Sequence, residues 1–436
     1  MSLLFDDLVQ DLKKRCTKIA KKYPIAENAT FTIDNILMSG FALFSIKDSS
    51  LAKFIKKLKD RKDNLKSIFK ITQAPSDTAL RTILDGVPTS EIQNLFVPYV
   101  KELGEQGVLS DYKILGNLYI PLDGTRHHSS QKVYCDCCLT THHQNGPTTY
   151  HHDAICACIV HPNHQEVFPI GIEEVIKQDG QTKNDCETNA AKRLLPRIIE
   201  HAPADQICLG GDAIYATGPM IRLSQQQAVI HDKEVHFVFS VKPGSHEYLF
   251  LQFERLEESG DIKHFTVTTK DKKFVAKYAN GLILNGTNSD IVVNFLYLEE
   301  HDLNKGTVKI FSWITDILIT TSNHTKIAKI GRSRWKIENE TFNTLKNQGY
   351  EFEHNFGHGH QFLAANFAVL MLLAFLFDQV QQRINLTFKL AKLKAGSRVA
   401  LWEKIRQYFD LLPVPSMDFI YQLIIGKIKF KVQYII

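Results

Sequence analysis

The stretch "YIPLDGTRHH", Tyr119 to His128, contains one acidic side chain, Asp123, between an apolar run and a glycine. An apolar run that stops at Asp and Gly is typical of a buried strand followed by a turn. The same pattern returns in "QICLGGDAIY", Gln206 to Tyr215, where Asp212 closes the run. Both aspartates are therefore predicted to end strands.

The segments around these two strands predict a mixed α/β sheet. Strand-like runs occur in "QKVYCDCCL" and "DAICACIVH", and the helical pattern "CETNAAKRLLPRIIEHA" precedes Asp212. Strand, strand, strand, helix, strand is the order that opens a mixed sheet. A second stretch, at about residues 248–320, has the pattern of strands with turns at "NGTNSD" and "LNKGT". We therefore expect a β-rich insertion into the α/β domain.

Helical patterns lie on both sides of this region. Apolar residues at three- and four-residue spacings predict a helical N-terminal region, 1–110, whose basic faces suit DNA binding. The α/β domain is predicted to cover 111–360, with helix returning at Ile327–Tyr350. A C-terminal helical region is predicted for 361–436.

The composition indicates a soluble globular protein, because apolar residues make up 44% and charged residues 23% of its 436 residues. The net charge of +5 is mild, but basic residues cluster, for example in "KKLKDRKDNLKSIFK", Lys56 to Lys70. The first residues lack the features of a signal peptide, and the longest apolar run, Phe367–Phe377, is shorter than the roughly 20 residues that span a bilayer. We expect a cytoplasmic protein without a membrane partner, whose cysteines are thiols or metal ligands.

A third carboxylate completes a possible metal site. Glu338 lies in the helical pattern "RSRWKIENE", far downstream of Asp123 and Asp212. Taken alone, each acidic residue has an ordinary explanation as a turn former or a surface glutamate. Together, two strand ends and one facing helix can supply the hard oxygen ligands that two divalent ions about 3.5 to 4 Å apart require for phosphoryl transfer.

The sequences around these carboxylates resemble a known family. "YIPLDGT", "GGDAIY" and "RWKIE" are similar to the three acidic motifs of DDE transposases, which have a ribonuclease H-like core, and more narrowly to the insertion sequence 4 group. The resemblance extends from about Pro75 to His360 and includes "DGQTKNDCETNAAKR" and "NQGYEFEHNFGHG". It implies a β-rich insertion between the second Asp and the Glu, for which the spacing leaves room.

The helix departs from the signature of that group, which is Tyr, two residues, Arg, three residues, Glu, six residues, Lys. Arg334 and Glu338 keep their spacing, but Gly331 stands in place of Tyr, and Lys346 falls one residue late. Glu340 is a rival third carboxylate. Two helical residues at this spacing point roughly 200° apart, so only one can face the site. We choose Glu338, because the "W-x-I-E" pattern ends there.

The resemblance implies a metal-dependent enzyme that acts on double-stranded DNA. Asp123 would bridge two ions, Mg²⁺ or Mn²⁺, while Asp212 would bind one ion and Glu338 the other. The expected reactions are phosphodiester cleavage at the transposon ends and strand transfer into target DNA, carried out by a homodimer. Two alternatives are a catalytically inactive, transposase-derived DNA-binding protein and a ribonuclease H-like nuclease without strand transfer.

Basic side chains near the carboxylates are candidates for phosphate contacts, although helical Arg and Glu four residues apart also pair without further function. Trp335 could stack on a base, but a core position is the more ordinary use of a Trp. The candidate DNA-binding residues are Arg334, Lys346, Arg332, Lys336 and Lys242, with the pair Lys192 and Arg193 as further candidates.

Cysteine and histidine residues are dense between Arg126 and Gln165. Cys135 and Cys138 have the spacing of a zinc-binding pair, which His142 or His161 could complete. In "AICACIV" the cysteines alternate with apolar residues, as inward side chains of a strand do. Zn²⁺ at Cys135 and Cys138 is therefore a possible second cofactor.

Overall fold

The computed structural model describes residues 1–23, 30–180 and 183–429. Residues 24–29 of the predicted N-terminal region, residues 181–182 of the block "DGQTKNDCETNAAKR" and residues 430–436 of the predicted C-terminal region lie outside the described residues.

The described strands form one mixed sheet with the order β3-β4-β2-β6-β7-β11-β10-β9-β8, in which β1 also pairs with β2 and β5 with β4. Strands β2, β6 and β7 run parallel to one another, and the other pairs are antiparallel. The strands are β1 (Lys113–Ile114), β2 (Asn117–Ser130), β3 (Leu139–Thr141), β4 (Thr149–Ile159), β5 (Phe168–Glu174), β6 (Gln206–Gly211), β7 (Glu234–Ser240), β8 (Lys263–Thr268), β9 (Lys272–Asn285), β10 (Asn288–Asp302) and β11 (Thr307–Thr315).

The core of the sheet has the order β5-β4-β2-β6-β7, with the long strand β2 at its centre. Helix α8 (Lys183–His201) connects β5 to β6, and α9 (Gly218–Ile230) connects β6 to the parallel strand β7. Parallel strands need such helical crossovers. This is the predicted ribonuclease H-like α/β core. The stretch "QKVYCDCC", however, is a loop with a turn rather than the predicted strand.

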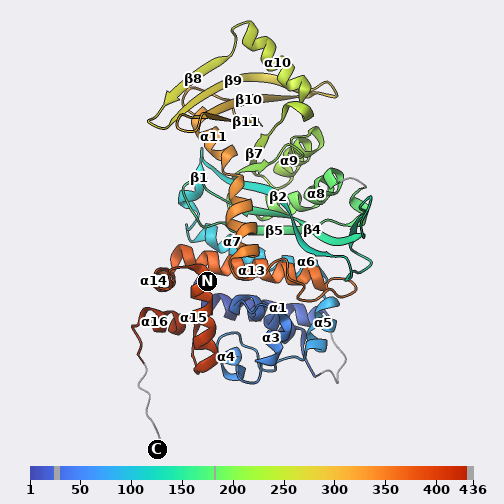
Figure 1. Cartoon of the computed structure of the whole chain (residues 1–436), viewed down its shortest axis with the longest axis vertical. Coiled ribbons are helices and arrows are strands. Elements are labelled where there is room, and N and C mark those ends of the chain that lie inside the picture. Colours follow the sequence, from blue (N-terminus) through green and yellow to red (C-terminus); the bar gives the residue numbers. More distant parts are fainter. Residues whose placement is uncertain (24–29, 181–182, 430–436) are drawn as a thin grey trace, which may run out of the picture.

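The predicted β-rich insertion is present, but it begins with a helix. Helix α10 (Glu247–Glu258) covers the start of the stretch that the sequence pattern assigned to strands. Leu249 and Phe253, four residues apart, are buried on one face of this helix, which is a helical period. Strands β8 to β11 then form an antiparallel meander that extends the core sheet through pairing of β11 with β7, including Trp313 with Ser240. Figure 1 shows the insertion at the end of the molecule away from the N- and C-terminal helices.

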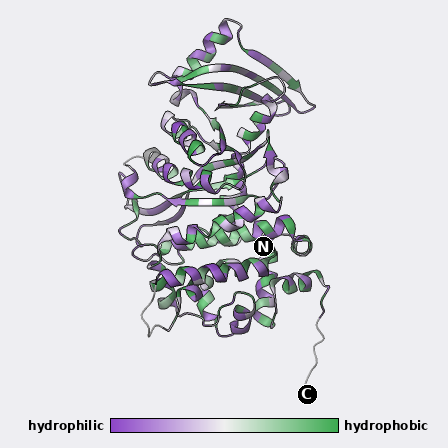
Figure 2. Ribbon diagram, turned by 180° about the vertical axis from the view of Figure 1, so that it is seen from behind, coloured by the Kyte–Doolittle hydropathy of each residue, from purple (hydrophilic) through white to green (hydrophobic). Residues whose placement is uncertain are grey.

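The N-terminal and C-terminal helices pack together on the other side of the sheet (Figure 1). The long helix α13 (Leu363–Ile384) packs against β5 and against several N-terminal helices, one of which also contacts β5 directly, and Figure 2 shows hydrophobic residues along α13. The N-terminal helices are α1 (Phe5–Lys22), α2 (Ile33–Ile46), α3 (Leu51–Lys56), α4 (Lys62–Ser67), α5 (Asp77–Asp85), α6 (Thr89–Gln93) and α7 (Phe96–Glu105). The C-terminal helices are α13 (Leu363–Ile384), α14 (Leu386–Ala395), α15 (Arg398–Leu411) and α16 (Met417–Ile425).

Helix α13 is the centre of the hydrophobic core. The Phe377 ring lies 5.0 Å from Phe41 of α2 and 4.9 Å from Tyr99 of α7, measured between ring centroids. Among the described residues, this one helix is long and apolar enough by length and composition to cross a membrane, and 94% of its apolar window is buried inside the protein. Its burial agrees with the expectation of a buried helix.

Candidate active site

Asp123 on β2 and Asp212 directly after β6 occupy corresponding positions in the register of these two parallel strands. The register of β2 and β6 pairs Leu118 with Ile207 and ends where Pro121 pairs with Gly210. Asp123 and Asp212 have the same separation of 89 residues and follow the last pair by two positions. Asp212 directly follows β6, as predicted. The prediction that Asp123 ends a strand is wrong, because β2 continues through Ser130 by pairing with β4.

The two glycines before Asp212 allow this arrangement. A Cβ atom at Gly210 would overlap the Tyr119 ring, and a Cβ atom at Gly211 would overlap the Tyr215 ring. Both tyrosines are buried. The pattern "GGD" therefore lets two aromatic rings pack directly on the backbone of β6 beside the carboxylates.

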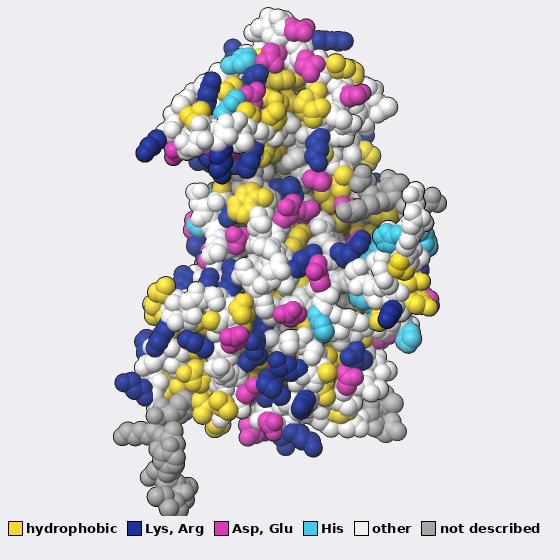
Figure 3. Space-filling model, viewed as in Figure 1, with side chains coloured by type: hydrophobic (Ala, Val, Ile, Leu, Met, Phe, Trp, Pro, Cys, Tyr) yellow, Lys and Arg dark blue, Asp and Glu magenta, His cyan; other side chains and the backbone are white. Residues whose placement is uncertain are grey.

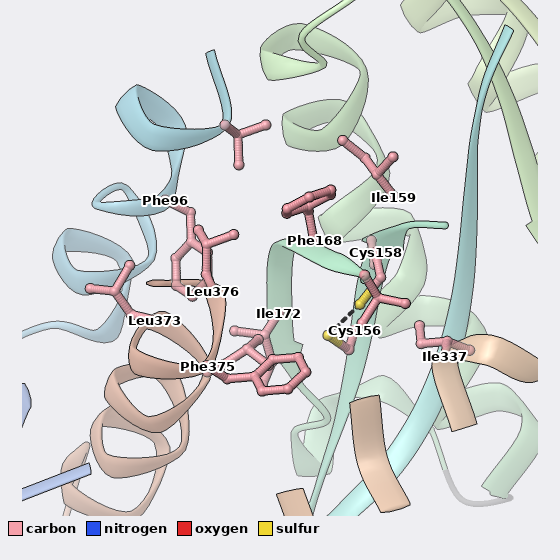
Figure 4. Close-up of a cluster of buried hydrophobic side chains, with 14 of the residues drawn as sticks. Phe96, Cys156, Cys158, Ile159, Phe168, Ile172, Ile337, Leu373, Phe375 and Leu376 are labelled. Carbon is pink, nitrogen blue, oxygen red and sulfur yellow. Dashed lines mark hydrogen bonds between the residues drawn. The ribbon is translucent and has the colours of Figure 1, made fainter. Parts of the chain in front are cut away.

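Glu338 is carried by a π-helical turn, η4 (Ile337–Phe342), which follows α11 (His324–Arg332) and continues into α12 (Asn343–Asn347). Turns of this type are often found at functional sites. Ile337 points into the hydrophobic core with residues of β4, β5 and α13, as Figure 4 shows. The neighbouring Glu338 is consequently turned out of the core, where its side chain is half exposed.

Arg334 joins two of the three carboxylates. Its Nη1 atom lies 2.8 Å from Asp123 Oδ2 and 2.7 Å from Glu338 Oε1. The two carboxylate oxygens are thus no more than 5.5 Å apart, the sum of these distances. Glu340 instead lies near Lys336 and Lys392, whose pKa values its charge influences. Glu338, rather than Glu340, therefore lies next to Asp123 in the structure.

The surroundings of Asp123 disfavour the charged form of its carboxyl group. Burial raises its pKa to about 7, the positive charge of Arg334 opposes this shift, and the nearby Glu338 carboxylate adds to it. The backbone N–H of Gly124 donates to Asp123 Oδ1 at 2.9 Å. Burial and the Glu338 charge together therefore outweigh the stabilisation of the Asp123 carboxylate by Arg334.

A further carboxylate, Glu187 of α8, was not predicted. A Cβ atom at Gly124 would lie 3.2 Å from its carboxyl group. Burial raises the pKa of Tyr215, and the charges of Glu187, Asp123 and Asp212 act in the same direction. All three carboxylates therefore lie near enough to Tyr215 for their charges to act on its hydroxyl group. The only sequence signal was a helical Glu in a block of the resembling family, which does not separate it from a surface residue.

The predicted DNA-binding residues fall into two groups: those that line a groove or lie at the carboxylates, and those that pair with other groups of the protein. Lys242 is exposed and lines a groove of about 1000 Å³ together with Lys192 and Asp212. Arg334 lies between the carboxylates. Arg193, by contrast, contacts Glu173 at 2.9 Å and also pairs with Asp179, so it is held within the protein.

The other basic candidates have partners inside the protein. Lys346 pairs with Glu353 at 2.8 Å, and Arg332 pairs with Glu300 at 2.7 Å. Lys336 is buried and donates from Nζ to the His164 carbonyl oxygen at 2.7 Å. Phosphate contacts from these three side chains stay a prediction, and the burial of Lys336 does not favour one.

Two aromatic residues explain features of the helix that carries Glu338. Gly331 replaces the Tyr of the family signature because the indole of Trp313, on β11, lies over it, and even a Cβ atom would overlap that ring. Trp335 is 44% exposed, so the interpretation of this residue as a core Trp is wrong. An exposed indole on the helical segment that carries Glu338 is compatible with base stacking.

A cluster of cysteine and histidine side chains lies near the first residues of β4, which carries His152. Cys135, Cys138, His152 and His358 offer ligand atoms that all lie within 4.8 Å of one another. The sequence pattern predicted the two cysteines but the wrong histidines. His142 contacts Thr148, and His161 stacks near other rings and accepts from the N–H of Asn163.

The chain belongs to the transposase DDE domain family. The family model matches residues 124–376, more than half of the chain, beginning directly after Asp123 and spanning both Asp212 and Glu338. Among the curated proteins that were compared, none matches the chain. The protein is thus a DDE transposase with a ribonuclease H-like fold, a class whose members generally use divalent metal ions and act on DNA.

Proposed function

We propose that the protein cleaves phosphodiester bonds at transposon ends and joins the freed 3′-hydroxyl groups to target DNA, with Asp123, Asp212 and Glu338 as its catalytic carboxylates. The contact of one Arg334 nitrogen with both Asp123 and Glu338 carries this proposal, because it brings residues 215 positions apart in the sequence to one point. The matching register of Asp123 and Asp212 adds the third carboxylate.

These residues fit two divalent cations, Mg²⁺ or Mn²⁺. Their ligand atoms are hard carboxylate oxygens, which such ions prefer. The guanidinium of Arg334 already occupies a position between two of the carboxylates, and the pKa of Asp123 is raised first by burial and further by the nearby Glu338 carboxylate. Asp123 would contact both ions, Asp212 one and Glu338 the other. When bound, the ions supply Lewis acidity for in-line displacement at phosphorus.

The groove beside Asp212 is the proposed path of the DNA backbone. Lys192 and Lys242 line it from two different segments, α8 and the turn after β7. Two ammonium groups at the rim of a groove would hold phosphates without reading the base sequence. Arg332, Arg334, Lys336 and Lys346 are proposed as further contacts, which would require those that are paired to exchange a carboxylate or carbonyl partner for a phosphate.

The three-region organisation is part of the same proposal: a DNA-binding helical region 1–110, a catalytic domain 111–360 and a helical region 361–436. Figure 3 shows Lys and Arg side chains over the helical end of the molecule, interspersed with Asp and Glu. Within Lys56 to Lys70, Arg61 is buried against Asp48, whereas Lys59, Lys62 and Lys66 are exposed. The exposed lysines are the part of this cluster available to transposon ends, which a homodimer would pair.

The proposal is tested with a duplex that carries the terminal inverted repeat found in the DNA flanking the gene. Wild-type protein with Mg²⁺ should nick this duplex at the repeat and join the labelled 3′ end to a plasmid. Asp212→Asn and Glu338→Gln should abolish both reactions and leave the gel shift of the duplex unchanged. Glu340→Gln is the matched control, because this side chain lies two residues from Glu338 on the same turn and should not affect cleavage.

Each contrary result identifies a different error. Cleavage that survives Asp212→Asn would overturn the assignment of the carboxylates. Hydrolysis by the wild type without joining would indicate a nuclease, and DNA binding without any Mg²⁺-dependent nicking would indicate an inactive transposase derivative.

A further inference from the structure

We propose that Cys135, Cys138, His152 and His358 bind one structural zinc ion. The four residues come from three parts of the chain: the loop after β2, the strand β4, and the segment between α12 and α13. Two thiolates and two imidazoles form a closed ligand set of the kind that structural zinc sites use. The site is separate from the carboxylates, and the proposal does not depend on the reaction that those carboxylates perform.

Three of the distances between the ligand atoms match those of a tetrahedral zinc site, and all four atoms lie within 4.8 Å of one another. Zn–S bonds of about 2.3 Å and Zn–N bonds of about 2.0 to 2.1 Å at tetrahedral angles place two sulfurs about 3.8 Å apart and sulfur about 3.6 Å from nitrogen. The Cys135 and Cys138 sulfurs are 3.9 Å apart, and each lies 3.5 Å from Nε2 of His152. Nε2 of His358 lies 3.1 Å from the Cys138 sulfur. Four ligand atoms therefore already surround a single point.

The surroundings prepare these groups to bind a cation. The N–H of Cys135 points at the Cys138 sulfur, 3.4 Å away, so the backbone can stabilise a thiolate there. Nδ1 of His152 lies 3.8 Å from a Glu174 carboxylate oxygen, a small movement away from the carboxylate–histidine pairing common around zinc. The ring of His358 is mostly buried, and its Nδ1 atom has no hydrogen-bond partner among the described residues.

A metal at this point would fasten the third carboxylate to the sheet. Cys138 and His358 are 220 residues apart in sequence. His358 follows the helical segment that carries Glu338, whereas His152 lies on β4, the strand that pairs with the Asp123 segment of β2. A zinc ion would link His358 to His152 through metal bonds. It would thereby hold the segment that follows Glu338 against β4.

The close sulfurs also suit a redox-active Cys pair, which is the principal competing explanation. A disulfide needs the sulfurs at about 2.05 Å, so it would have to pull Cys135 and Cys138 together and away from the imidazoles. A disulfide uses only the two sulfurs, whereas the imidazole nitrogens that lie 3.5 Å and 3.1 Å from the Cys138 sulfur complete a four-ligand set. The arrangement therefore favours zinc.

Metal analysis of the full-length protein, purified without chelators, tests the proposal. The expected result is one zinc ion per chain, and after replacement by Co²⁺ the visible spectrum of a tetrahedral site with thiolate-to-metal charge transfer. Cys138→Ser and His358→Ala should lose zinc during dialysis that leaves the wild type loaded. Cys137→Ser and His360→Ala are matched controls and should keep it, since both side chains are exposed neighbours of the ligands.

His358→Cys guards against the possibility that ligand removal simply prevents folding. This variant replaces an imidazole by a third thiolate, so it should retain the ion while the charge-transfer band of its Co²⁺ form gains intensity. Wild-type protein without zinc, a Cys135–Cys138 disulfide detected by mass, zinc that His358→Ala retains during dialysis, or a Co²⁺ spectrum that His358→Cys leaves unchanged would each overturn the proposal. None of these measurements involves DNA cleavage, so they fail or succeed independently of the proposed function.

Discussion

The raised pKa of Asp123 predicts that this carboxylate destabilises the metal-free protein, and that Asp123→Asn stabilises it in a pH-dependent manner. Burial lifts the pKa from 3.8 to about 7 in the folded protein. A group with a raised folded pKa contributes stability below its unfolded pKa and loses that contribution as the pH rises through the folded value. Wild-type stability should therefore fall between about pH 4 and pH 7 relative to the Asn variant.

The size of the effect follows from the shift. A difference of about three pKa units corresponds to about 4 kcal/mol at pH 8 and to about 2 kcal/mol at pH 5, where the folded carboxyl group is protonated. The favourable charge of Arg334 is already contained in this shift, because it is one of the contributions to the pKa of Asp123. With an unfolding entropy of about 2.1 cal/mol/K for each residue, 1 kcal/mol moves the Tm of a chain of this length by about 1 °C. Asp123→Asn should melt about 4 °C above the wild type at pH 8 and about 2 °C above it at pH 5.

Thermal unfolding of the full-length protein without added divalent ions measures this difference at both pH values. Asp153→Asn is a control of opposite sign: although burial acts against it, hydrogen bonds from His151 and Arg126 lower the pKa of Asp153. That control should be destabilised at pH 8 because a lowered pKa stabilises above the unfolded value. Added Mg²⁺ should stabilise the wild type more than Asp123→Asn. An Asn variant that melts no higher than the wild type at pH 8, or with an equal difference at both pH values, would refute the reasoning.

Three further substitutions probe the surroundings of the site and the core. Gly331→Ala should cost about 1 to 3 kcal/mol of unfolding free energy, because the new methyl group overlaps the rigid Trp313 ring; an unchanged thermal midpoint would contradict this. Lys47→Met should cost about 3 to 5 kcal/mol in denaturant titrations, because it leaves Asp378, now 2.5 Å from the ammonium, buried without a cation. Trp335→Ala should change stability by less than about 0.5 kcal/mol but weaken binding of a fluorescent single-stranded oligonucleotide by about 1 to 3 kcal/mol, and equal affinities would exclude stacking.

The positions of Asp123 and Asp212 could be predicted because the signal for each is local. An apolar run followed by Asp and Gly can be recognised without knowing which segments it contacts. The two aspartates are 89 residues apart, and paired residues of β2 and β6 are also 89 residues apart. The end of β2 could not be predicted, since a strand of polar residues such as "TRHHSS" forms only where a partner is available. That partner, β4, lies further along the chain.

Contacts between distant segments account for the other errors. His358 completes the cysteine cluster from 220 residues away, and nothing in the spacing of "GHGH" connects it to Cys138. Glu187 looks like any helical surface residue until Gly124 is placed beside it. Helix α10 had a readable period of four in Leu249 and Phe253, so the prediction of strands there was an error of interpretation rather than a limit of the sequence.

The distance between the proposed catalytic carboxylates Asp123 and Glu338 depends on the packing of the core as well as on the two motifs. Asp123 is paired across the strands with Cys156, so the two side chains share a face of the sheet with Cys158, two residues further along β4. The turn that carries Glu338 packs on that face, where Thr341 Oγ1 lies 3.5 Å from the Cys158 sulfur and Ile337 joins the same hydrophobic cluster (Figure 4). Because packed interiors resist changes of even one methylene group, a larger residue at position 158 would push this turn away from β2. A buried strand residue that touches neither DNA nor metal would thereby separate the carboxylates that Arg334 holds together.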